Sequence, residues 1–103
     1  MDNTNNNERA VLLVSDMLSI QKGLICGTEE EQMKLLAAYI EELIHNDFSR
    51  LLQILYRVDV PEEKLKKALA ENKESLSSGE IIARLLVERQ VQKIELRAKY
   101  SSR

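Results

Sequence analysis

The sequence predicts an all-α fold, a small bundle of four or five helices. The chain of 103 residues contains three glycines and one proline, so it lacks the turn residues that a set of β-strands requires. Leucine, glutamate, lysine, alanine and arginine, which all favour helices, are abundant. A chain of this length is expected to form a single domain, which we place at residues 8–100.

The N-terminal segment 1–7, MDNTNNN, has little to bury and is predicted to be a disordered tail. A first helix is predicted from about Glu8 to Lys22, with Gly23 as a left-handed cap. Its apolar residues form two neighbouring seams: Ala10, Leu13, Met17, Ile20 and Leu24 in one, and Val11, Val14, Leu18 and Ile25 in the other. Two seams cover about half of the helix circumference, so this helix is expected to contact two neighbours.

A second helix begins with a capping box, in which Thr28 and Glu31 bond each other's backbone N–H. Apolar residues then recur every three or four positions without loss of phase over 29–58. This spacing favours one long central helix. The alternative is a break near 45–47, where Asp47 would suit the N-cap of a separate helix.

Pro61 ends the central helical region, because it removes a backbone donor and disfavours helical geometry in the residue before it. Asp59 and Glu62 resemble a further capping box, with the proline in the first turn, where it is tolerated. A short helix is therefore predicted over about 60–71.

A long C-terminal helix is predicted from a capping box of Ser77 and Glu80 to about Lys99, with residues 101–103 frayed. Its first half has an apolar side that suits the monomer core. Its second half has a separate apolar seam, formed by Val87, Val91, Ile94 and Ala98. A monomer of this size would struggle to cover that seam, so these four residues are candidates for an interface with another subunit.

A basic stripe formed by Arg89, Lys93 and Arg97 follows the same helix at four-residue spacing. Six basic and two acidic residues lie from Arg84 to Arg103, against nine basic and fifteen acidic residues in the rest of the chain. One hypothesis is weak, salt-dependent binding of nucleic acid or another anion. The stripe lacks interleaved aromatic residues, so we favour long basic side chains that flank a packed seam and meet acidic residues across an interface.

Candidate chemical sites are few. Glu42 and His45 have the i,i+3 spacing that di-metal carboxylate bundles use, with Asp16 as a conceivable further ligand in a dimer. At 100° per residue both lie about 140° to 160° from the centre of the apolar stripe, so we expect an exposed pair and no metal or cofactor. Cys26 is the one cysteine, so an intrachain disulfide is excluded, and no nucleophile motif or phosphate loop accompanies it.

The functional expectation is a non-catalytic protein that binds other proteins, first of all its own copy as a homodimer or larger assembly. The net charge of −2 argues against a general polyanion binder. The N-terminal region has neither a signal-peptide pattern nor an apolar stretch long enough for a membrane span, so a cytoplasmic location is expected. The alternatives are anion or nucleic-acid binding through the basic stripe and, less favoured, a dimeric metal-carboxylate protein.

Overall fold

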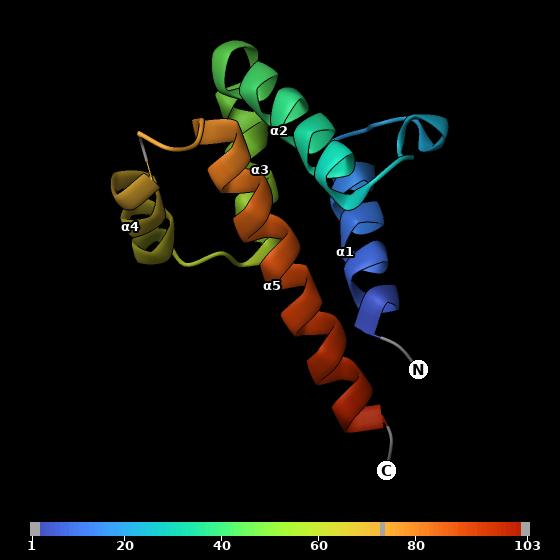
Figure 1. Ribbon diagram of the computed structural model, residues 1–103. Coiled ribbons are helices and arrows are strands. Elements are labelled where there is room, and N and C mark those ends of the chain that lie inside the picture. The colour runs from blue at the N-terminus through green and yellow to red at the C-terminus, as the bar shows by residue number, and fades with distance from the viewer. Residues whose placement is uncertain (1–2, 73, 102–103) are drawn as a thin grey trace.

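Helix α5, Ser78–Ser101, is the longest helix and contacts every other α-helix (Figure 1). A computed structural model describes residues 3–72 and 74–101 of the chain. The remaining elements of those residues are α1 (Asn3–Met17), the short 3-10 helix η1 (Lys22–Leu24), α2 (Glu29–Asn46), α3 (Phe48–Val58) and α4 (Glu62–Asn72). They contain no strand, so the predicted all-α bundle is confirmed.

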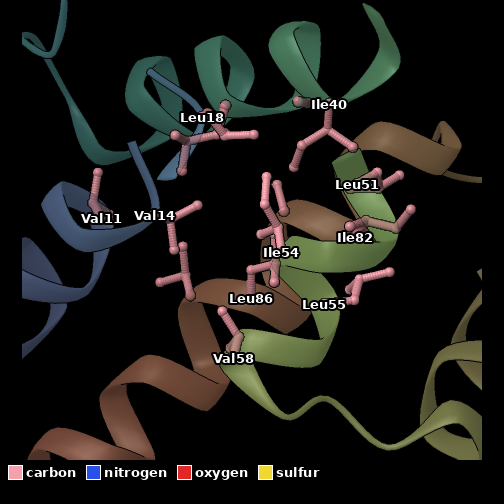
Figure 2. Close-up of a cluster of buried hydrophobic side chains, with 14 of the residues drawn as sticks. Val11, Val14, Leu18, Ile40, Leu51, Ile54, Leu55, Val58, Ile82 and Leu86 are labelled. Atoms are coloured by element: carbon pink, nitrogen blue, oxygen red, sulfur yellow. The ribbon is translucent and has the colours of Figure 1, made fainter. Parts of the chain in front are cut away.

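The core lies between α1, α2, α3 and α5, whose apolar side chains point toward one another (Figure 2). Its largest fully buried side chains are Val11, Val14, Leu36, Ile40, Leu51, Val58 and Leu86. The predicted contact of the first helix with two neighbours is confirmed, since α1 packs against both α5 and α2. Helix α4 has no fully buried residue and packs on the side of α5.

Helices α2 and α5 approach each other closely at Gly79, the second residue of α5. A Cβ atom at this position would lie 2.5 Å from the carbonyl oxygen of Ala37 and 2.6 Å from Cγ of Glu41. The Gly79 N–H donates to Oε2 of Glu41 at 2.7 Å, so a carboxylate of α2 satisfies one of the open amides at the positive end of α5. Glycine therefore allows the backbones to touch and exposes an amide to the neighbouring helix.

The central helical region is broken at Asp47, so the alternative of two helices describes it and the single helix over 29–58 is wrong. Asp47 leaves helical geometry, with φ −156° and ψ 69°. Its Oδ1 accepts from the N–H of Arg50 at 3.3 Å, while its own N–H donates to the carbonyl of Leu43 at 2.9 Å. The apolar phase continues across the break because both helices face the same core.

Helix α1 differs from the prediction at its start. It begins at Asn3, so residues 3–7 are helical where a disordered tail was expected, and residues 1–2 lie outside the described residues. The side-chain amide of Asn7 donates to the carboxylate of Glu29 at the start of α2. This contact between helices favours an ordered start despite the poor helix propensity of asparagine.

Helix α1 also ends earlier than the predicted Lys22, at Met17. Ser19 takes the left-handed conformation, with φ 62°, while Gly23 does not have a positive φ. The N–H of Ile20 donates to the carbonyl of Ser15 at 2.9 Å, and that of Ser19 to Asp16 at 3.1 Å, which is the Schellman pattern of a helix end.

Helix α3 ends in the same way at Asp59, which has φ 67°. The N–H of Val60 donates to the carbonyl of Leu55 at 3.2 Å, and that of Asp59 to Tyr56 at 3.2 Å. The side chain of Asp59 bonds Arg89 of α5, so the capping box predicted with Glu62 is replaced by a contact from a distant part of the chain.

The other two predicted capping boxes are confirmed. At α2, the Glu31 N–H donates to Oγ1 of Thr28 at 3.1 Å, and the Thr28 N–H donates to Oε1 of Glu31 at 2.8 Å. At α5, Ser77 and Glu80 bond each other in the same reciprocal way, at 3.2 and 3.0 Å. Helix α5 includes Ser101, whereas the rest of the predicted frayed end lies outside the described residues.

Gly79→Ala is expected to lower the free energy of unfolding by about 1 to 3 kcal/mol, since the added methyl group forces α2 and α5 apart. Gly23→Ala is the matched control, because a Cβ atom there meets nothing within 4 Å. Urea denaturation of both variants measures the difference. Equal unfolding midpoints would contradict the close approach of the two helices.

The capping box of α5 makes stability depend on pH. The hydrogen bond from the Ser77 N–H holds the pKa of Glu80 below its ordinary value. Because the folded pKa is the lower one, the stabilisation is present above the pKa of the unfolded chain and is lost as the pH falls through the folded pKa. Glu80→Gln removes the titration and keeps a group that can complete a capping box.

We therefore expect wild type and Glu80→Gln to differ most in unfolding free energy near neutral pH, and the difference to shrink in acid. Urea denaturation at a series of pH values from neutral to acidic measures this difference. A difference that is constant down to the most acidic point would show that the Glu80 carboxylate contributes nothing through its charge.

Candidate interaction site

The apolar seam of α5 is divided between the core and the surface. Val87 is buried, and Val91 and Ile94 are partly buried against the core, whereas Ala98 is exposed. The N-terminal part of the seam therefore packs inside the monomer, and its C-terminal residue is exposed to solvent. In Figure 1, the C-terminal end of α5 extends beyond the start of α1.

An apolar groove of about 720 Å³ lies between α1 and α5. Leu12 and Leu13 contribute its α1 side, and Ile94 and Ala98 contribute its α5 side. Leu12 is 49% exposed and Leu13 is 40% exposed, so their side chains offer apolar area to a partner. We call this surface the α1–α5 groove.

Charged side chains border the α1–α5 groove. Arg9 and Asp16 stand on the α1 side and Arg97 on the α5 side. Among the described residues, neither Arg9 nor Asp16 forms a salt bridge. The surface thus combines an apolar centre with charges at its margin, an arrangement typical of protein interfaces.

The first two residues of the basic stripe bond the end of α3. Arg89 donates from Nε to the Asp59 carbonyl at 3.2 Å and from Nη2 to its Oδ2 at 3.4 Å. Lys93 donates from Nζ to the carbonyl of Arg57 at 3.4 Å. These cations lie at the negative end of the α3 dipole, where open carbonyls attract them. Arg97, the third residue of the stripe, lies two turns away from Arg89 at the groove.

The sequence-predicted pair Glu42 and His45 is exposed on α2. The Nε2 of His45 lies 3.9 Å from Oε1 of Glu41, the next carboxylate along the helix. In the part of the chain that the structure describes, no group of three or more His, Cys, Asp or Glu side chains is placed to hold a metal ion. Cys26 is exposed in the loop before α2, and no hydrogen bond joins it to His45.

A second exposed apolar stripe runs along α3. Phe48, Leu52 and Tyr56 lie at i, i+4 and i+8, and Tyr56 is 83% exposed. The buried residues of α3 occupy the adjoining side of the helix. The four-residue spacing of these three residues is visible in the sequence. It does not show that they are exposed, because α3 also contains the four apolar residues that fill the core.

The sequence interpretation missed Leu12 and assigned Leu13 to a packed seam. Both leucines belong instead to the outer side of α1, while Val11 and Val14 fill the core. The available signal was the number of apolar residues in α1, which exceeds what one side of a helix can bury.

Arg89→Ala is expected to lower the free energy of unfolding by about 1 kcal/mol, because the end of α3 loses a charged donor. The loss should shrink when Asp59→Asn is already present, since asparagine tolerates the left-handed conformation but carries no charge. Thermal or urea denaturation of the double-mutant cycle measures the coupling. Arg84→Ala, on an exposed residue of the same helix, serves as control and should change stability less.

The α1–α5 groove is concave, apolar at its centre and charged at its margin. None of the described helices combines the length and apolar content needed to cross a membrane. The chain matches no protein-family model, and comparison with curated proteins and with solved structures finds no match to it.

Proposed function

We propose that this protein is a non-catalytic protein–protein interaction module that self-associates through the α1–α5 groove. The observation that carries the proposal is the groove itself, where Leu12 and Leu13 are about half exposed beside Ile94 and Ala98. Contiguous apolar surface of this kind is disfavoured in soluble monomers and is typical of binding surfaces. Burial of these side chains against a second subunit removes them from water and drives association.

The contacts of the basic stripe do not favour the anion-binding alternative. Arg89 and Lys93 are bonded to the end of α3, so a phosphate would have to compete with carbonyl and carboxylate groups of the same chain. Nucleic-acid binding of useful strength also depends on several phosphate contacts at once. Protein binding through apolar surface is therefore the function that we advance.

Leu12→Glu is expected to dissociate the assembly, because a carboxylate in the groove cannot be buried without a partner. Sedimentation equilibrium at tens of micromolar should give at least twice the chain mass of 11.8 kDa for wild type and a mass near 11.8 kDa for the variant. Leu96→Glu is the matched control, since Leu96 is 48% exposed against 49% for Leu12 and lies outside the groove.

A wild-type mass of one chain would contradict self-association. Dissociation by Leu96→Glu to the same extent as by Leu12→Glu would move the contact to another face of the molecule. Circular dichroism of both variants establishes that the helices are retained.

A further inference from the structure

The outward side of α1 has a symmetric arrangement of charge around its two exposed leucines. Arg9, Leu12, Leu13 and Asp16 follow the spacing i, i+3, i+4, i+7, which places them on one side of a helix, within an arc of about 100°. All four line the α1–α5 groove. Arg9 and Asp16 lie at equal distances along the sequence from the midpoint between Leu12 and Leu13, one on each side.

We propose that two copies of this chain pair through antiparallel α1 helices, with the two-fold axis passing between Leu12 and Leu13. In this register Arg9 of each copy meets Asp16 of the other, and the leucines of the two copies meet at the centre. The proposal rests on the proposed function, since it specifies how self-association occurs.

Symmetry explains why this distribution of charge fits a second copy. An isologous interface brings the same surface of both subunits together, so a patch of one sign would face itself and repel. A face with one positive and one negative charge, equally distant from its centre, becomes complementary to itself when it is turned end for end. The spacing of about 10 Å along α1 between Arg9 and Asp16, from the helical rise per residue, matches in both copies without adjustment.

The placement of these charges within α1 supports a role outside the monomer. Asp16 lies in the last turn of α1, at the negative end of the helix dipole, where an acidic residue is unfavourable. Among the described residues it has no salt-bridge partner that offsets this, and neither has Arg9. A partner arginine near Asp16 would remove the unfavourable interaction.

The pairing also places the α1 helix of each copy in the α1–α5 groove of the other. Leu12 and Leu13 of one subunit then approach Ile94 and Ala98 of its partner as well as the partner's leucines. The exposed end of the α5 seam is covered by the same contact, so one interface accounts for both apolar sides of the groove.

Charge exchange tests the register. In Arg9→Asp, two pairs of aspartates face each other across the two-fold axis, and in Asp16→Arg two pairs of arginines do so. We expect each variant alone to dimerise about tenfold more weakly than wild type or worse. An equimolar mixture of the two should recover a dimer that contains one subunit of each kind, as should the double variant with both changes. Sedimentation equilibrium and native mass spectrometry measure mass and composition.

The exchanges follow the preference of the helix dipole, with an acid nearer the start of α1 and a base nearer its end, so the variants should fold. If either variant loses helix by circular dichroism, Arg9→Gln and Asp16→Asn replace the pair. Each should then weaken the dimer, and their mixture should recover part of the loss, because the mixed dimer retains one of the two pairs of Arg9 and Asp16.

The outcomes separate this register from self-association in general. A dimeric wild type whose single variants dimerise equally well, or whose mixture stays monomeric, would overturn the antiparallel α1 pairing and leave the proposed function standing. A monomeric wild type would overturn both.

Discussion

The contact of α5 with α2 at Gly79 determines how the other helices can be arranged. Because a hydrogen replaces a side chain there, the backbone of α5 reaches the carbonyl of Ala37, and Glu41 bonds the amide at its start. The close approach buries Ile40 of α2 and Ile82 of α5 in one core. With α5 fixed at its N-terminal end, α1 and α3 fill the remaining sides, and charged side chains bond the helix ends that this arrangement brings together.

The C-terminal end of α5 extends beyond the core. Helix α2 and α3 pack along its N-terminal part, where Leu86 is fully buried, but α5 continues well beyond this point to Ser101. Helix α1 lies beside this part of α5, and the C-terminal end of α5 extends beyond the start of α1 (Figure 1). The α1–α5 groove is thus a consequence of helix length, since α5 is longer than the bundle that holds it.

Features that depend on neighbours in sequence could be predicted, whereas features that depend on distant residues could not. The capping box at Thr28 forms within one turn, so the residues alone specify it. Asp59 and Glu62 have the residue types of a capping box as well. The carboxylate of Asp59 instead accepts a hydrogen bond from Arg89, which lies 30 positions away in the sequence. The apolar seam of α5 is buried at Val87 and exposed at Ala98, and the helices that cover its residues come from distant parts of the chain. The groove side of α1 was missed because helical spacing alone does not say which of two apolar sides meets the core.

Hydrogen bonds join both ends of α1 to neighbouring helices, which favours a specific partner at the proposed interface over nonspecific contact. Asn7 bonds Glu29 of α2 near the start of α1, and at the other end Arg50 of α3 donates to Oγ of Ser19 at 2.6 Å and to the carbonyl of Met17 at 3.4 Å. The segment between these two ties is the one that presents the exposed leucines. A surface already fixed in its binding geometry loses little conformational entropy on association, so a modest apolar area can stabilise a complex. The bonds at the two ends of α1 therefore hold in place the segment through which we propose self-association.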